Sequence, residues 1–326
     1  MTRTPEDDRL LAQAATWEGG PLSPTTITGV SRRHGIDLAT AILYHQLSQR
    51  PDTSEFLTRL RGPIQPPDAD ILIAVVPGAF HREHRKTGAD GARIVDLARQ
   101  MGLSAEVIPT AGFGRLTENA QTIHRWLQAH RSSRIGLISL SKGGADVKQA
   151  LALGDAEQSF RHVVSWVSLS GLVQGTPLID WLRRRPWRWW AIRGALWWRG
   201  HPGATLLDLR HGPQGMLAFW PALPPHLTTV HVCGFPLGRH LAHPWAPRAY
   251  GRLSPLGPND GGGILLGDLL EYPGLICPVW GADHYLSPRW DATSMLTGII
   301  AASLSPRHAT RSASQPKTPP ASKSNA

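Results

Sequence analysis

Short, nearly uninterrupted apolar runs recur along the chain between residues 70 and 281. We expect strands at six of them: 70–77, 104–110, 134–140, 161–169, 228–235 and 275–281. Segments with apolar residues at helical spacing lie between the first four runs, near 90–101, 117–130 and 143–153. Continuous apolar strands that alternate with amphipathic helices predict a parallel sheet covered on both faces. The pattern therefore indicates the α/β class, with an open, mostly parallel sheet and helices on both faces.

Three segments fall outside this alternation. Residues 1–66 have mainly helical spacing and predict a helical N-terminal extension before a main domain at 67–302. Within that domain, an insertion of roughly fifty residues, at about 173–227, separates the fourth strand from the fifth. The end of the chain, 303–326, is rich in Ser, Pro and basic residues and has no periodic apolar positions, which predicts a disordered basic tail.

The stretch SRRHGIDLATAILY in the N-terminal extension has two possible interpretations. Its basic start resembles a helix-turn-helix reader of DNA. Its apolar positions, however, suit packing onto the main domain, and no basic recognition helix follows. We therefore expect no nucleic-acid partner.

Two of the strand candidates end in Ser-Leu-Ser and then glycine, so each could deliver a serine to a tight turn. A nucleophile elbow needs a strand, a serine in a strained turn, and small residues two positions before and after it. Ser141 meets this pattern, with Ser139 before it, Gly143 after it and a helix opening next. Ser170 does not, because Gly171 comes one position too early. We expect that glycine only to turn the chain toward the insertion.

A serine needs a histidine to accept its proton and a carboxylate to orient that histidine. His284 follows the last strand candidate, at the sheet edge where ligands bind in such folds, and is our candidate base. Asp260, in the turn sequence Pro-Asn-Asp-Gly between the last two strands, is the favoured acid. Asp180 is the rival acid, and Asp283 is expected to point away from its neighbour His284.

An oxyanion hole would need two backbone amides near the serine. One is the amide of Lys142, directly after the serine, and the other would come from the loop after the first strand. Gly78 lets the backbone of that loop approach closely, and Ala79 or Phe80 would donate. This expectation depends on position alone, because backbone donors leave no sequence signature.

The motifs PGAF, SLSKGG, GTPLID, PNDGG and GADHYL, in this order over residues 68–303, resemble the α/β-hydrolase superfamily, specifically its bacterial lipase- or esterase-like members. The resemblance implies a nucleophile, acid and base at Ser141, Asp260 and His284, and oxyanion donors at Ala79 and Lys142. The chain departs from the family pattern in two places. A proline stands where many members carry a histidine before the oxyanion glycine, and a serine replaces the first elbow glycine. Both departures weaken any inference about the substrate of this chain from the substrates of the family.

Other residue clusters do not match the patterns of metal or cofactor sites. The loop HREHRKTGAD at 81–90 matches no common zinc spacing and is too basic for a divalent cation, so we expect a polar loop in which Glu83 pairs with a neighbouring arginine. No Gly-rich phosphate loop is present, which leaves nucleotide chemistry without support. Cys233 and Cys277 lie inside strand candidates and are expected to be buried and reduced. We therefore expect neither a metal nor another cofactor.

The insertion contains DWLRRRPWRWWAIRGALWWRG, which has six tryptophans among many arginines. We favour a cap whose tryptophans pack over the active site, with arginine stems lying along them. The same composition also suits peripheral binding of the segment 181–199 to a membrane surface. A lipase lid does both, so the two interpretations are compatible.

The net charge and the start of the chain bear on the partners and the location of the protein. The net charge of +10 suggests attraction to anionic surfaces without identifying a partner. The start MTRTPEDDRL lacks an apolar signal region and no apolar run approaches eighteen residues. Both features favour the cytoplasm, with peripheral membrane contact left open.

We expect hydrolysis of a small-molecule or lipid-like carboxylic ester through an acyl-serine. The alternatives are a non-catalytic or membrane-associated binding protein of the same fold, and an acyltransferase with the same triad.

Overall fold

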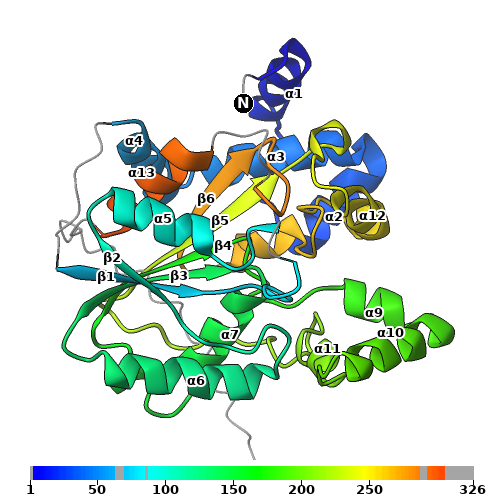
Figure 1. Cartoon of the computed structure of the whole chain (residues 1–326). Coiled ribbons are helices and arrows are strands. Elements are labelled where there is room, and N and C mark those ends of the chain that lie inside the picture. Colours follow the sequence, from blue (N-terminus) through cyan, green and yellow to red (C-terminus); the bar gives the residue numbers. More distant parts are fainter. Residues whose placement is uncertain (1–2, 63–69, 85–86, 287–291, 305–326) are drawn as a thin grey trace, which may run out of the picture.

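The sheet has six strands, and all five pairings between neighbours are parallel (Figure 1). The computed structural model describes residues 3–62, 70–84, 87–286 and 292–304. The strand order is β2-β1-β3-β4-β5-β6. Each strand lies inside a predicted run: β1 (Ile71–Val76), β2 (Ser104–Val107), β3 (Arg134–Leu140), β4 (Val163–Leu169), β5 (Thr228–Phe235) and β6 (Leu275–Trp280). The predicted α/β class and parallel sheet are confirmed.

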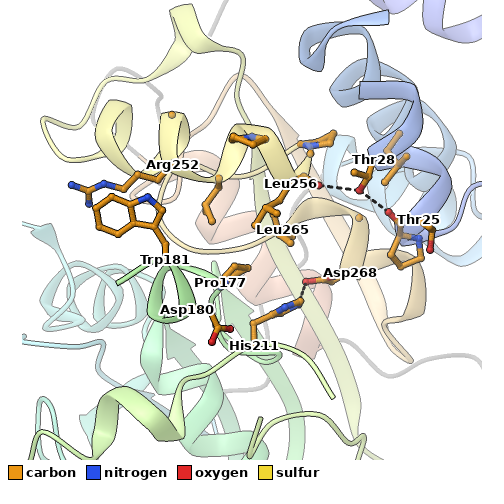
Figure 2. A pocket seen from close by; sticks show the side chains of 18 of the residues that line it. Thr25, Thr28, Pro177, Asp180, Trp181, His211, Arg252, Leu256, Leu265 and Asp268 are labelled. Atoms are coloured by element: carbon orange, nitrogen blue, oxygen red, sulfur yellow. Dashed lines mark hydrogen bonds and ion pairs between the residues drawn. The ribbon is translucent and has the colours of Figure 1, made fainter. Parts of the chain in front are cut away.

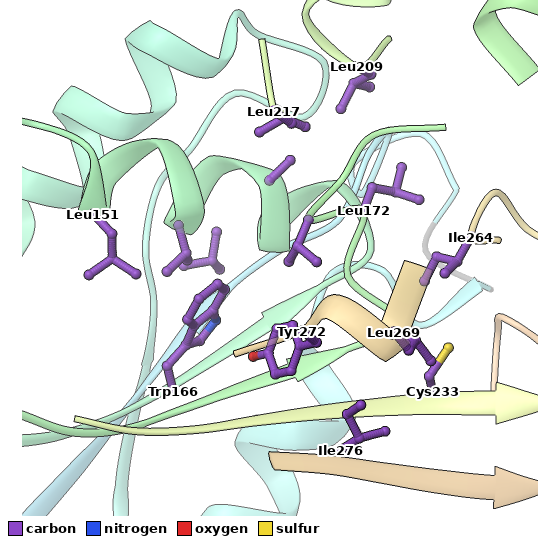
Figure 3. Close-up of a cluster of buried hydrophobic side chains, with 14 of the residues drawn as sticks. Leu151, Trp166, Leu172, Leu209, Leu217, Cys233, Ile264, Leu269, Tyr272 and Ile276 are labelled. Atoms are coloured by element: carbon purple, nitrogen blue, oxygen red, sulfur yellow. The ribbon is translucent and has the colours of Figure 1, made fainter. Parts of the chain in front are cut away.

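Helices cover both faces of the sheet, as the continuous apolar strands require. One face carries α4 (Pro51–Arg61), α5 (Ala92–Gln100) and α13 (Ala292–Leu304), and the other carries α3 (Ile36–Ser48), α6 (Leu116–Ala129) and α7 (Lys142–Leu151). Figure 3 shows part of the core beneath α7, where Trp166 of β4 lies among aliphatic side chains. The indole N–H of Trp166 donates to Ser139 Oγ at 2.9 Å, so this polar group is satisfied inside the core.

The N-terminal helices α1 (Pro5–Ala15), α2 (Pro24–His34), α3 and α4 pack against the sheet or against each other. α1 and α2 each begin with a capping hydroxyl and a proline in the first turn. α3 buries its apolar residues, and Tyr44 makes edge-to-face contacts with Phe235 of β5 and Trp280 of β6. α3 is therefore a packing helix of the main sheet, which agrees with the packing interpretation of SRRHGIDLATAILY.

The insertion (residues 173–227) contains α9 (Leu178–Arg183), α10 (Pro186–Trp198) and α11 (Thr205–Asp208). Both the start and the C-terminal part of the insertion are tied to α7 by Lys148, whose buried Nζ donates to the carbonyls of Val173 at 2.7 Å and Leu217 at 2.8 Å. The ammonium also lies 3.9 Å from the ring centroid of Trp220. Burial lowers the pKa of Lys148 to about 7. The short helices α8 (Ala156–Ser159) and α12 (Ala246–Leu253) complete the α-helical elements of the described residues.

Both cysteines are buried and free, as predicted. In the register of β5 and β6, Cys277 pairs with Val232, so Cys233 is one residue out of step and its side chain faces the other side of the sheet. Burial raises the pKa of the Cys277 thiol to about 12. Within the described ranges, no helix is both long and apolar enough to cross a membrane. Most of the predicted basic tail, from residue 305 onward, lies outside the described residues.

Candidate active site

Ser141 lies in a strained turn between β3 and α7. Its backbone has φ 47° and ψ −114°, in a region that residues with a Cβ rarely adopt. Gly143 makes this turn possible, because a Cβ there would lie 2.6 Å from the carbonyl oxygen of Val76 and 2.7 Å from that of Pro77. The start of α7 therefore crosses the end of β1 at a distance that only glycine permits, as the small residue two positions after Ser141 predicted.

The neighbouring strand ends in a similar turn that the sequence did not reveal. Ser170 also has φ 47°. A Cβ on Gly171 would come 2.0 Å from Ser168 Oγ, and one on Gly144 would come 2.8 Å from the Cα of Gly171. The interpretation of Gly171 as merely turning the chain is therefore wrong, because this glycine also makes room for α7. Ser170 is buried, and its Oγ has no hydrogen-bond partner among the described residues, so no imidazole activates it.

The structure brings Ser141, His284 and Asp260 together at the carboxyl edge of the sheet. Ser141 Oγ lies 3.0 Å from His284 Nε2, and His284 Nδ1 lies 2.5 Å from Asp260 Oδ2. A carboxylate oxygen only accepts, so Nδ1 carries the proton and Nε2 is left with a lone pair that can accept from the serine hydroxyl. His284 and Asp260 are both buried.

Asp260 is held in place by its own loop. Its second oxygen, Oδ1, accepts the backbone amides of Gly262 at 2.9 Å, Gly263 at 3.0 Å and Ile264 at 3.0 Å. Gly262 also leaves space for the imidazole, since a Cβ there would lie 1.9 Å from His284 Cγ. The sequence Pro-Asn-Asp-Gly predicts only a turn here, yet the glycines after Asp260 both orient the carboxylate and admit the histidine ring.

The ionisation of this pair follows from its surroundings. Burial alone would raise the pKa of Asp260, but the charge and hydrogen bond of His284 and the loop amides hold it below its ordinary value. Burial alone would lower the pKa of His284, but the Asp260 carboxylate, with a smaller contribution from Asp283, raises it above 6.5. Asp260 is thus an anion, and His284 readily takes up a proton.

The two alternative aspartates have other partners. Asp180 pairs with Arg210 at 2.8 Å and with Arg183 at 3.6 Å, within the insertion. Asp283 accepts the backbone amides of Ala242 and His243, each at 3.0 Å, rather than contacting the imidazole of His284. Of the three aspartates, Asp260 is the one hydrogen-bonded to His284.

The backbone amides of Ala79 and Lys142 lie on the two segments that meet at Ser141. A Cβ built on Gly78 would lie 3.5 Å from Ser141 Cβ, which places the Gly78–Ala79 peptide beside the serine. Neither the Ala79 amide nor the Lys142 amide donates a hydrogen bond to another described residue. Phe80, which follows Ala79, has φ 54°, and its amide already donates to the carbonyl of Gly112 at 3.2 Å.

A buried polar network, which no sequence pattern predicts, connects these two segments. Lys142 Nζ donates to both carboxylate oxygens of Asp146, at 2.7 and 3.0 Å, in the interior. Asn119 donates to Asp146 at 3.0 Å and makes two hydrogen bonds with the backbone of Ala111. Gly112 follows Ala111, and its carbonyl accepts the hydrogen bond from the Phe80 backbone amide. The network thus connects the Lys142 segment to the loop that supports Ala79.

The loop at 81–90 contacts the insertion through Glu83. Glu83 Oε1 lies 2.8 Å from His201 Nε2, so among the described residues its partner is a histidine of the insertion and not the expected Arg82; the other neighbouring arginine, Arg85, lies outside the described residues. A local arginine was the nearer partner in sequence, whereas His201 is brought in by the fold. The His201 ring also makes an edge contact with Phe80, at 5.4 Å between ring centroids. Among the described residues, no group of acidic, histidine or cysteine side chains could hold a metal ion.

The tryptophans of the insertion do not cover Ser141 as a set, so that prediction is wrong for most of them. Trp187, Trp190, Trp197 and Trp198 of α10 are exposed to solvent. Trp181 instead lines a cleft of about 760 Å³ between α9, α12 and α2, shown in Figure 2. Neither Ser141 nor His284 lines this cleft.

The overall arrangement resembles two solved structures. The metagenomic carboxyl esterase MGS0156 superposes with a TM-score of 0.54 and 16% identity, over 86% of this chain and 90% of that one. The lipase BlEst2 of Bacillus licheniformis, in its mature form, superposes with a TM-score of 0.52 and 19% identity, over 73% of this chain and 91% of that one. No protein-family model and no curated protein sequence matches this chain. At these identities the likeness shows the fold, which is that of the α/β-hydrolases.

Proposed function

We propose that this protein is a serine hydrolase that cleaves a carboxylic ester through an acyl-serine intermediate. The observation that carries the proposal is the continuous hydrogen-bonded chain from Ser141 Oγ through the imidazole of His284 to Asp260. A serine in a strained elbow, a histidine with a free Nε2 lone pair and a buried carboxylate are the three groups that acyl transfer from an ester requires. The fold shared with an esterase and a lipase is compatible with this activity.

In the proposed reaction, Ser141 Oγ attacks the ester carbonyl carbon while His284 Nε2 accepts the hydroxyl proton. The amides of Ala79 and Lys142 donate to the oxyanion of the tetrahedral intermediate. The C–O bond to the alcohol then breaks, and His284 returns the proton to the departing oxygen. A water molecule, deprotonated by His284, attacks the acyl-serine, releasing the carboxylic acid and restoring Ser141.

The substrate would be a small or lipid-like ester with an apolar part. Phe80 stacks on Phe113 with ring centroids 4.5 Å apart, directly after the proposed oxyanion donor Ala79. Tyr285 follows the base and contacts its ring, at 5.2 Å between centroids. Aromatic side chains at both ends of the site favour a hydrophobic acyl or alcohol group.

Hydrolysis of p-nitrophenyl esters of increasing acyl length tests the proposal. We expect turnover that falls by roughly 10⁴-fold or more in Ser141→Ala, because the nucleophile is removed. Ser170→Ala is the matched control, since it removes a hydroxyl from a turn of the same φ without touching His284. No turnover of any ester by the folded protein, or equal losses in the two variants, would overturn the proposal.

A further inference from the structure

α10 lies at the outer edge of the molecule (Figure 1), and it carries a row of exposed tryptophans. Trp187, Trp190, Trp197 and Trp198 have exposed fractions between 65% and 81%. Large aromatic side chains exposed together on one element are uncommon on a protein surface that has no partner. We call these four side chains the tryptophan ridge.

The ridge lies along one side of α10. At about 100° of rotation per residue, the four tryptophans fall within an arc of about 100°. Leu196, which is buried, lies on the opposite side and anchors the helix to the rest of the insertion. The side of α10 opposite the ridge is held by Leu196, while Ile192 on that side is 40% exposed, less than any tryptophan of the ridge.

Arginines flank the ridge, and acidic residues are absent from this part of the chain. From Trp181 to Arg199 there are six arginines and no aspartate or glutamate. On α10 itself, the Arg188 guanidinium lies 4.8 Å from the Trp187 ring centroid, and the Arg193 guanidinium lies 5.0 Å from that of Trp190. Each of these two tryptophans therefore has a cation beside it.

A second group of guanidiniums lies at the base of α10, around Trp181. Those of Arg185, Arg252 and Arg188 lie 3.9, 4.2 and 5.4 Å from the Trp181 ring centroid. No carboxylate of the described residues forms an ion pair with any of the three. Burial, and then the nearby positive charge of Arg188, Arg248 and Arg185, lowers the pKa of Arg252. The region is thus a concentration of positive charge in which the neighbouring carboxylate, Asp180, pairs with Arg183 and Arg210 and leaves these three guanidiniums without an ion-pair partner among the described residues.

We propose that the tryptophan ridge docks onto the surface of a membrane that contains anionic phospholipids. The indoles would lie at headgroup depth, where an aromatic ring with one polar edge is favoured, and the flanking guanidiniums would pair with lipid phosphates. Charge selects this occupant over a second copy of the chain. A symmetric dimer through the ridge would bring two sets of arginines together, whereas an anionic surface supplies the missing counter-charge.

This docking is independent of the proposed hydrolysis. The ridge is on α10, and none of its four residues is among Ser141, His284, Asp260 or the proposed oxyanion donors. The helix nevertheless leads directly to His201, which pairs with Glu83 and contacts Phe80 beside the site. Docking would therefore place the membrane near the loop that carries Ala79, and turnover of a water-soluble ester can serve as a control for the folded site.

The test is co-sedimentation of the full chain with vesicles of phosphatidylcholine alone and of phosphatidylcholine with phosphatidylglycerol. We expect binding to the mixed vesicles that weakens as salt rises. Trp197→Ala/Trp198→Ala should lower the affinity by about tenfold or more, because it removes ridge side chains that would be buried at the interface. Arg188→Gln/Arg193→Gln should lower it by about fivefold for each arginine. Val107→Ala and Arg131→Gln change an exposed apolar and an exposed basic residue away from the ridge, and they should leave binding unchanged.

Unchanged ester turnover and thermal melting in the ridge variants would show that the fold survives. Absence of wild-type binding to both vesicle types would overturn the proposal. So would equal binding by the ridge variants and the controls. Sedimentation equilibrium without vesicles provides the remaining arm. A dimer that dissociates in Trp197→Ala/Trp198→Ala, together with vesicle binding that this variant retains, would assign the ridge to a second copy of the chain and overturn the membrane proposal.

Discussion

Replacing Asp260 with asparagine would change the proton position on His284 while keeping the shape of the site. Asp260 Oδ1 accepts three backbone amides, at 2.9, 3.0 and 3.0 Å. The asparagine oxygen must remain at that position, because turning the side chain would set an NH₂ group against three N–H donors. The NH₂ group then faces His284 Nδ1 and donates to it, which forces the ring proton onto Nε2. In that tautomer His284 cannot accept the proton of Ser141.

The expected loss follows from this wrong tautomer. An Asp-to-Asn change in a serine protease triad, with geometry retained, lowers kcat by about 10⁴-fold. At about 1.4 kcal/mol for each factor of ten, we expect Asp260→Asn to raise the barrier by about 5 kcal/mol. The assay is the initial rate of hydrolysis of a short p-nitrophenyl ester, with circular dichroism melting as the test of folding.

The matched control is Asp180→Asn, which neutralises the rival aspartate and weakens its pairing with two arginines of the insertion. We expect that variant to retain activity within a few-fold of wild type, since surface ion pairs contribute little. A folded Asp260→Asn protein with activity within tenfold of wild type would refute the reasoning about the tautomer. An Asp180→Asn loss as large as that of Asp260→Asn would refute the assignment of the acid.

Three further predictions follow from the same structure. The reaction needs neutral His284, and the pKa of His284 is raised, so kcat/KM should fall as the pH is lowered, with a midpoint above pH 6.5. A midpoint at or below pH 6.5 would contradict this. Gly143→Ala should destabilise the fold by about 1–3 kcal/mol in urea titrations, whereas Gly194→Ala, with open space around it, should not; equal effects would be inconsistent with the crossing at β1. Lys148, with a pKa of about 7 when folded and 10.5 ordinarily, releases its proton first in the folded state as pH rises. The unfolding free energy of wild type relative to Lys148→Met should therefore increase by up to about 1.4 kcal/mol per unit between pH 7 and 10, and a constant difference would contradict the lowered pKa.

Much of the sheet and the spacing of the site could be predicted because they depend on local patterns. Buried parallel strands need continuous apolar residues, and five of the six strands are such buried runs, whereas the edge strand β2 lies in a predicted run but is mostly exposed. The elbow depends on the residue two positions after Ser141, which is also local. The carboxyl edge of a parallel sheet gathers loops distant in sequence, which is why His284 and Asp260 could be chosen from their positions after strands.

The features that the sequence did not reveal depend on contacts between distant segments. Lys142 and Asp146 are four residues apart on one helix, a spacing that normally indicates an exposed pair, yet α6 covers them and Asn119 completes their hydrogen bonding. The pairing of Glu83 with His201 joins two loops separated by more than a hundred residues. Apolar residues occur on every side of α10, so the exposed side depended on where Leu196 packs.

Labelling with a fluorophosphonate tests the central claim most directly, because this reagent forms a covalent adduct only with an activated serine. We predict one adduct, mapped by mass spectrometry to the peptide that contains Ser141. It should be absent in Ser141→Ala and still present in Ser170→Ala. A well-folded protein that does not react, or an adduct that maps to Ser170, would contradict the account.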